Sequence, residues 1–288
     1  MPDKYSAVWV SHSSLNDFIT CPQLYYLRNV YKRPETGHKM TVMSPPLALG
    51  QAVHEVIESL SKLPTEKRFQ EPLLMKLSLA WEKVTGKKGG FSSLEQELTY
   101  KQRGEEMIRR AEKHPGPLKN LAVKINMELP HYWLSEEDQI ILCGKIDWLE
   151  YLPETDQVNI IDFKTGKNEE ESNSLQLPIY RLLAANCQKR AVGHACYWYL
   201  QWSDELDEKS LPDLDSSRAR VLEVAKQVKL ARKLERFKCP QGESCKACQP
   251  FLKIQRGEGE FVGVNDYNTD VFILAQPDSS AAEESIIL

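Results

Sequence analysis

The sequence contains no run of about 18 apolar residues, the length that a membrane-spanning helix requires. It also contains no phosphate-binding loop of the form G-x-x-x-x-G-K-[ST], so we expect no ATPase activity of the P-loop type. Near the amino terminus no basic segment precedes an apolar one, so we expect no secretory signal. Together these absences predict a cytoplasmic protein that has no membrane partner.

Positive charge is not in excess, because 37 lysines and arginines stand against 41 acidic residues and give a net charge of −4. This balance excludes a uniformly basic surface, although a local basic patch for nucleic acid stays open. A chain of 288 residues with 41% hydrophobic and 27% charged residues is typical of a globular protein. Disulfides are rare in the cytoplasm, so we expect the seven cysteines to be thiols or metal ligands.

The apolar pattern divides the chain into a helical front part and an α/β part. Periodicity near 3.6 residues predicts helices over 13–27, 46–62, 71–85 and 93–113. Strand-like segments follow at 120–134, 139–152 and 157–166, and the turns "SEED" and "PETD" between them indicate hairpins. A helix at 174–188, a strand at 191–202 and a long helix at 215–238 complete the pattern. We therefore expect a mixed α/β core of the order β-β-β-α-β, with an N-terminal helical elaboration and a C-terminal helix.

We expect this pattern to fold as one domain over residues 1–276. Its parts would be a mainly helical segment, the α/β core, and a helix with a cysteine-rich closure, over 11–118, 119–203 and 214–251. Residues 277–288 are polar and poor in aromatic side chains, so we expect a disordered tail there.

The stretch "NIIDFKTGK", residues 159–167, ends an apolar strand with Asp162 and Lys164. Positions i and i+2 of a strand share a face, so these two side chains project together while Phe163 faces the other way. Asp147, on the preceding strand, would come close to Asp162 in a hairpin. Two neighbouring carboxylates repel unless a cation lies between them, and oxygen ligands suit Mg²⁺ or Mn²⁺. Such an ion beside a lysine predicts hydrolysis of phosphodiesters.

Several short motifs follow one another in a definite order along the chain. They are G-x-x-x-H ending at His54, G-x-x-D ending at Asp147, D-x-K over 162–164, and Q-L-x-x-Y over 176–180. With the opening "SHSSLNDFITCPQLYYL", they resemble the RecB-like branch of the PD-(D/E)xK nuclease superfamily from about residue 11 to 250. The resemblance implies a restriction-endonuclease-like core, in agreement with the order of elements expected above.

The same resemblance implies a role for each motif residue. The implied ligands of Mg²⁺ or Mn²⁺ are His54, Asp147, Asp162 and the backbone carbonyl of Phe163. Lys164 would be the catalytic lysine, and Gln176 and Tyr180 would position the scissile strand or support the site. Glu128, on the first predicted strand, is a weaker candidate that could hold a second ion or brace the first.

Three cysteines lie close together in "RFKCPQGESCKACQPF", with the spacing C-x5-C-x2-C over Cys239, Cys245 and Cys248. Three neighbouring thiols predict a metal site, which needs a fourth ligand. The iron–sulfur subset of RecB-like nucleases includes AddB-type and CRISPR-associated enzymes, in which one N-terminal cysteine joins three C-terminal ones around a [4Fe-4S] cluster. Resemblance to this subset implies Cys21 as the fourth ligand. The spacing expected there is C-x2-C-x5-C, and the reversed intervals leave zinc as the alternative.

These features predict a metal-dependent DNA nuclease, an exonuclease or end-processing enzyme of DNA repair, recombination or CRISPR adaptation. Its substrate would be single strands or ends, and a helicase, CRISPR or recombination protein could be its partner. The alternative is a non-catalytic DNA-binding or helicase-partner module that a metal centre stabilises. The complete set of Asp147, Asp162 and Lys164 favours the enzyme. Basic residues at helical spacing, Lys226, Lys229, Lys233 and Arg236, could follow a DNA backbone or form an ordinary solvated face.

Overall fold

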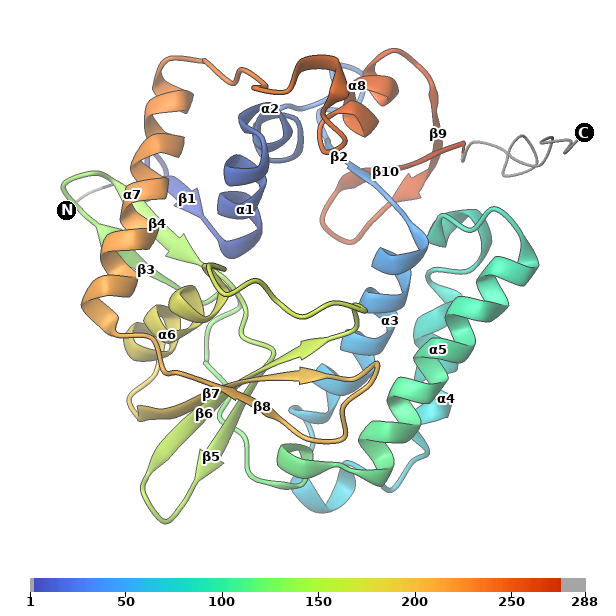
Figure 1. Ribbon diagram of the computed structural model, residues 1–288, viewed down its shortest axis with the longest axis vertical. Helices are drawn as coiled ribbons and strands as arrows, with labels where there is room; N and C mark the ends of the chain where they lie inside the picture. Colours follow the sequence, from blue (N-terminus) through green and yellow to red (C-terminus); the bar gives the residue numbers. More distant parts are fainter. Residues whose placement is uncertain (1–2, 276–288) are drawn as a thin grey trace, which may run out of the picture.

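The computed structural model describes residues 3–275, which form a mixed α/β architecture with three sheets (Figure 1). The strands are β1 (Val8–Val10), β2 (Lys39–Val42), β3 (His131–Ser135), β4 (Ile140–Cys143), β5 (Trp148–Leu152), β6 (Gln157–Lys164), β7 (Ala191–Tyr199), β8 (Asp207–Lys209), β9 (Gly259–Val264) and β10 (Thr269–Leu274). The α-helices are α1 (His12–Thr20), α2 (Pro22–Tyr25), α3 (Pro45–Leu60), α4 (Leu73–Glu82), α5 (Leu94–Lys113), α6 (Gln176–Cys187), α7 (Leu214–Lys233) and α8 (Gln249–Gln255). Among the described residues, no helix combines the length and the apolar character needed to cross a membrane.

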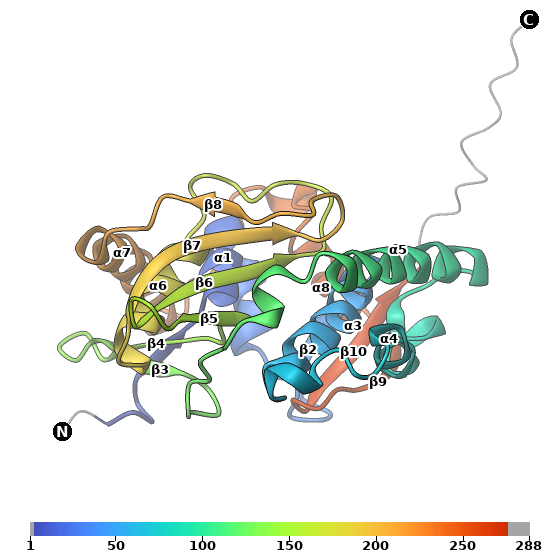
Figure 2. The ribbon, with the colours of Figure 1, turned by 90° about the horizontal axis from the view of Figure 1, so that it is seen from below.

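The central sheet has the order β5-β6-β7-β8, and Figure 2 shows these four strands side by side. β6 pairs antiparallel with β5 and parallel with β7, and α6 makes the crossover between the two parallel strands. Side chains alternate along β6, so Val158 and Ile160 pack in one apolar cluster with α6 and α7, while Ile161 and Phe163 pack in another with α3, α4 and α5. The two helical layers therefore lie on opposite sides of the sheet (Figure 1).

Helix α3 carries one predicted site residue, His54, toward the end of the central sheet. The helix begins with Pro45, which suits a first turn because its missing N–H would have no partner there. Its apolar stripe is buried against α4 and α5, which fixes the rotation of the helix about its axis. A Cβ at Gly50 would lie 3.2 Å from Thr165 Oγ1, so glycine permits the close approach of α3 to the end of β6.

The predicted strands before α6 differ from the observed ones. Residues 139–152 form two strands, since the segment from Gly144 to Asp147 carries the chain from β4, which pairs with β3 and β1, to β5 of the central sheet. Glycine in a strand interior weakens the ladder, which is consistent with a break at this point. Of residues 120–134, only those from His131 onward form a regular strand. Four strands, β3 to β6, therefore lie between α5 and α6, and Glu128 lies exposed in a bend rather than on a strand.

Both ends of the described chain also depart from the prediction. The single helix expected over 13–27 is interrupted at Cys21, because Pro22 cannot donate a backbone hydrogen bond and starts α2 instead. Residues 34–46, where the sequence pattern predicts no helix or strand, contain β2, whose parallel partner β10 comes from the far end of the described chain. The β9–β10 hairpin was not predicted. The tail expected at 277–288 lies outside the described residues.

Candidate active site

The two aspartates of the motifs come together where β5 and β6 pair. Trp148 lies opposite Ile161, so Asp147 and Asp162 occupy the next opposed positions. Asp147 Oδ2 accepts a hydrogen bond of 3.0 Å from the backbone N–H of Phe163. Burial and the charge of Asp162 raise the pKa of Asp147 well above its ordinary value. This mutual repulsion is the electrostatic condition under which a cation between the two acids is stabilising.

His54 joins the acids from helix α3. Its Nδ1 lies 3.1 Å from Oε1 of Glu58 and 3.5 Å from Oδ2 of Asp147. The potential ligand atoms of His54, Glu58 and Asp147 lie within 4.8 Å of one another. Burial alone would lower the pKa of His54, but the hydrogen bond to Glu58 and the nearby carboxylates outweigh it and raise the pKa to about 9. The side chains therefore create a negative site that protonated His54 partly neutralises.

Lys164 projects from the end of β6 on the same face as Asp162. Its Nζ lies 3.1 Å from Asp162 Oδ2 and 2.7 Å from Glu170 Oε2, and it also donates a hydrogen bond to Gln176 Oε1. Burial would lower the pKa of Lys164, but the charges of Asp162 and Glu170 raise it above the ordinary value. The ammonium therefore keeps its proton at neutral pH and is held in one place by three partners.

Gln176 and Tyr180, one turn apart on α6, support Asp162 from the other side. Gln176 Nε2 donates to Asp162 Oδ1 at 2.7 Å and to the Tyr180 hydroxyl at 3.3 Å. Burial, together with the charges of Asp147 and Asp162, raises the pKa of Tyr180 well above its ordinary value, so the phenol stays neutral. The Gln176 amide thus fixes one carboxylate oxygen of Asp162 and leaves the second to Lys164.

Two open cavities reach this group from different sides. One, of about 640 Å³, is lined by His12, Glu170 and neighbouring residues of α1 and α7. The other, of about 750 Å³, is lined by His54 and Glu58. Burial lowers the pKa of His12, and the nearby ammonium of Lys164 adds to this effect, so the imidazole is neutral at pH 7. Solvent can therefore reach His12 and Glu170 from one cavity and His54 and Glu58 from the other.

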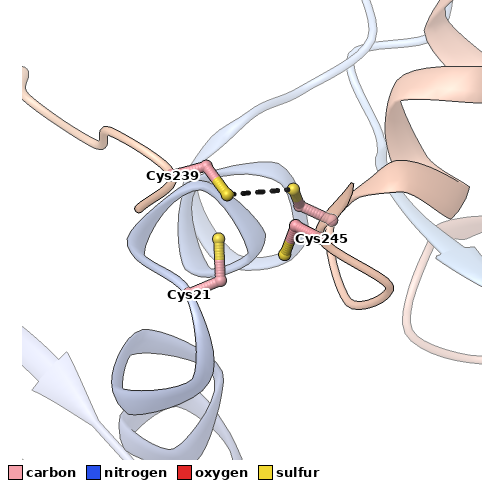
Figure 3. A group of neighbouring side chains, drawn as sticks. Cys21, Cys239 and Cys245 are labelled. Carbon is pink, nitrogen blue, oxygen red and sulfur yellow. Dashed lines mark hydrogen bonds between the residues drawn. The ribbon is translucent and has the colours of Figure 1, made fainter. Parts of the chain in front are cut away.

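A second group capable of holding a metal consists of four cysteines, Cys21, Cys239, Cys245 and Cys248. Cys21 lies between α1 and α2, and the other three lie in the segment that leads to α8, so an early and a late segment of the chain meet there (Figure 3). The four sulfur atoms lie within 4.8 Å of one another. All but Cys239 are buried. Four convergent thiols from distant segments are the donor set of a structural metal centre.

The sulfur positions and the local charges suit a bound cation. Cys239 Sγ and Cys248 Sγ are 3.8 Å apart, and metal–sulfur bonds of about 2.3 Å in a tetrahedron require a separation of about 3.8 Å. Burial raises the pKa of Cys21, whereas at Cys245 the backbone N–H groups of Cys248 and Ala247 outweigh burial and lower the pKa to about 7. One thiol of the group is therefore readily ionised near neutral pH.

Comparison with protein families agrees with this geometry. The model of the PD-(D/E)XK nuclease superfamily matches residues 9–250. The chain belongs to this superfamily. Membership indicates the general class of metal-dependent nucleases. The mixed α/β core is the restriction-endonuclease-like fold expected from the sequence. No curated protein matches the sequence.

The residues at the carboxylate site fit the divalent metal that nucleases of the superfamily use. Oδ2 of Asp162 is buried and, among the described residues, receives no hydrogen bond of acceptable geometry, although Lys164 Nζ lies 3.1 Å away. A buried carboxylate oxygen without a hydrogen bond is costly, and the single ammonium of Lys164 compensates only part of the charge that Asp162 and Asp147 bring together. Carboxylate oxygens with one imidazole are donors that suit Mg²⁺ or Mn²⁺.

Sequence reasoning missed two acidic neighbours and one histidine. Glu58 follows His54 by four residues, and that spacing on a helix could have found it. Glu170 belongs to an acidic loop without a motif, and only the fold brings it to Lys164. His12 lies inside the opening "SHSS", and nothing in that stretch marks the histidine as a site residue.

Two sequence hypotheses receive no support from the geometry. Glu128 is exposed, and neither group of metal-capable side chains among the described residues includes it. On α7, Lys226 Nζ lies 2.9 Å from Asp138 Oδ2, and Lys229 Nζ donates to the Asp138 carbonyl at 2.5 Å. These two lysines therefore hold α7 against the turn between β3 and β4.

Proposed function

We propose that this chain is a deoxyribonuclease that hydrolyses DNA at ends or in single strands, as an exonuclease of repair, recombination or CRISPR adaptation. The observation that supports the proposal most is the state of Asp162. One of its oxygens is fixed by Gln176, and the other is buried beside Lys164 without a hydrogen bond. Structural carboxylates in a core have both oxygens hydrogen-bonded, so this arrangement favours a site built for an ion.

In this proposal His54, Asp147, Asp162 and the Phe163 carbonyl would hold Mg²⁺ or Mn²⁺, and Glu58 would supply a further carboxylate. His54 would release its proton when the ion binds, because only the neutral imidazole can be a ligand. When bound, the ion polarises the phosphate and acidifies a water molecule. The N–H of Phe163 orients Asp147, and Gln176 orients Asp162, so the two acids are positioned before any ligand arrives. Gln176 and Tyr180 thus act on the reaction through Asp162.

Lys164 orients the attacking water and neutralises the charge that develops on the phosphate. Its raised pKa means that it acts as a cation and not as a base at neutral pH. Glu170 and Gln176 hold the ammonium while leaving it directed at Asp162. The arrangement delivers a preorganised positive charge, which is the form of stabilisation that phosphodiester hydrolysis requires most.

For the four cysteines we propose a [4Fe-4S] cluster, as the resemblance to the iron–sulfur subset implies. The short distances between the sulfur atoms suit a single tetrahedral ion, so zinc is the alternative that the test must separate. The role in either case is structural. The centre would join the segment around Cys21 to the segment 239–248 within one domain over residues 1–276. Visible absorption of anaerobically purified protein, together with iron and zinc analysis, distinguishes the two.

The activity test uses end-labelled linear DNA and circular DNA, each single- and double-stranded, with Mg²⁺ or Mn²⁺. Release of nucleotides from linear DNA, with circles left intact, is the expected result. Activity that persists in EDTA contradicts the proposal, and preference for RNA corrects its substrate. If the protein binds DNA without cleaving it, the chain is a binding module that works with a helicase or a recombination protein.

A further inference from the structure

The β9–β10 hairpin lies outside residues 9–250, the part of the chain that the superfamily matches. It nevertheless forms a wall of the cavity of about 750 Å³ that contains His54 and Glu58. Residues 262–267 of the hairpin line this cavity, opposite helix α3. A strand of nucleic acid that leaves the carboxylate site on this side must therefore pass the hairpin.

The turn end of β10 is anchored to the rest of the fold. β10 pairs in parallel with β2, and Asp270 at its start is fully buried. The carboxylate of Asp270 accepts hydrogen bonds of 2.8 Å from both Arg33 and Thr36. Lys87 forms an ion pair of 2.8 Å with Glu260 on β9, and both side chains are more than half exposed. The contacts of Asp270 therefore hold the turn end of β10 against the segment that precedes β2.

The tip of the hairpin borders the cavity and contains a bulge and a closed turn. A bulge lies between Val271 and Phe272, opposite Gly263, whose φ of 144° is a conformation that side chains other than glycine rarely adopt. At the turn, the Asn265 side chain accepts hydrogen bonds from the N–H groups of Tyr267 and Thr269 at 3.0 and 3.1 Å. The turn is thus closed, and it presents Tyr267 with 79% of its surface exposed.

The chemistry of the cavity suits one nucleotide of a single strand. Lys83 and Lys88 line it as cations, and Glu55, Glu58 and Asp266 line it as anions. Glu55 is paired with Lys83 at 2.5 Å, and Glu58 faces His54. Two of the three acids thus have local partners, and the exposed aromatic ring of Tyr267 offers a platform on which a base of any sequence can stack.

We propose that Tyr267 stacks on an unpaired nucleobase of the strand whose phosphate lies at the carboxylate site. The inference rests on the proposed nuclease function and adds to it a preference for unpaired nucleotides next to the scissile phosphate. A paired base within a duplex is stacked on both sides and offers no open face to the ring.

The test measures the affinity of the full-length protein for single-stranded oligonucleotides that carry 2-aminopurine at successive positions. Ca²⁺ replaces Mg²⁺ so that the DNA stays intact during the measurement. The Tyr267→Ala variant should bind roughly tenfold more weakly, because loss of one stacked base has an effect of this order. Tyr267→Phe should bind as the wild type does. Quenching of 2-aminopurine at a single position should vanish in Tyr267→Ala only.

Tyr5 provides the matched control, because it is 88% exposed and lies outside the cavity. Equal affinities of Tyr267→Ala and Tyr5→Ala would overturn the inference, and so would equal losses on blunt duplex and on single strands. Wild-type cleavage separates the two proposals. If the wild type cleaves DNA but Tyr267→Ala is unchanged, only the hairpin inference fails. If Tyr267 governs binding while the wild type never cleaves, only the nuclease proposal fails.

Discussion

The four cysteines and the carboxylate site can both hold a metal, but they differ in what surrounds them. The cysteines lie in an apolar cluster with Leu24, Leu27, Phe251 and Ile254, and three of the four are buried. The carboxylate site is lined by polar and charged side chains and lies between two open cavities. Structural metal sites are closed by their ligands, whereas catalytic sites keep a position open for water or substrate.

The two sites also differ in how their ligands are oriented. Hydrogen bonds from Phe163 and Gln176 hold the acids at the sheet end in fixed positions. The thiols have few such bonds and depend on the fold to bring residue 21 to residues 239–248. We therefore expect changes at the carboxylates to affect catalysis with little loss of stability, and changes at the cysteines to do the reverse.

The largest effect is expected for Asp162→Asn. The substitution removes a metal ligand, so the cleavage rate should fall by about 10³-fold or more. The melting temperature should stay within a few degrees of the wild type, because the amide keeps the side-chain volume. Asp156→Asn, on the exposed turn of the same hairpin, is the control that should cleave normally. A mutant that still cleaves at a tenth of the wild-type rate would remove Asp162 from the site.

Lys164→Ala should reduce single-turnover cleavage by roughly 10²–10³-fold, since one electrostatic donor is lost. DNA affinity measured in Ca²⁺ should change little. Lys164→Arg should not restore the rate, because a planar guanidinium cannot take the place of a compact ammonium held by three partners. Lys167→Ala, on the following loop, serves as control. Cleavage by Lys164→Ala within about threefold of wild type would make the lysine a structural residue.

Cys21→Ala is expected to act on stability. Without its fourth ligand the centre should lose its metal, and the loss of roughly 3 kcal/mol would lower the melting temperature by about 6–12 °C. Metal analysis, visible absorption and thermal unfolding measure this outcome, with Cys143→Ala as a buried control outside the group. Full metal content in Cys21→Ala would show that another residue completes the centre.

The smallest effect is expected for Asp270→Asn, which removes the buried charge near the start of β10 and leaves both metal-capable groups intact. Arg33 and His38, together with Thr36, lower the pKa of Asp270 despite its burial. The stability that this carboxylate contributes is therefore present above its unfolded pKa, near 4, and is lost as the pH falls through the lower folded value. The mutant should be less stable by roughly 1–2 kcal/mol at pH 7. Denaturant unfolding should show the difference closing below about pH 4, and a difference that persists there would refute this account.

Local sequence patterns were sufficient to predict several features. The i, i+2 spacing predicted that Asp162 and Lys164 share one face, and in the structure Lys164 Nζ lies 3.1 Å from Asp162 Oδ2. The apolar stripe of α3 and the helix with Gln176 and Tyr180 were also recognisable, with ends within a few residues. The strand expected at 139–152 was wrong as a single element, because periodicity shows that residues are extended but not which sheet they join.

The sequence by itself determined which side chains are available: a D-x-K pair on one strand face, a histidine on an amphipathic helix, and a set of thiols. These are properties of neighbours along the chain, and strand and helix periods fix them. Only the tertiary structure decided that Glu58 and Glu170 border the site, that four sulfurs converge, and that the β9–β10 hairpin closes a cavity at His54. These contacts join distant segments, and their formation depends on chain closure and core packing, which no local pattern records.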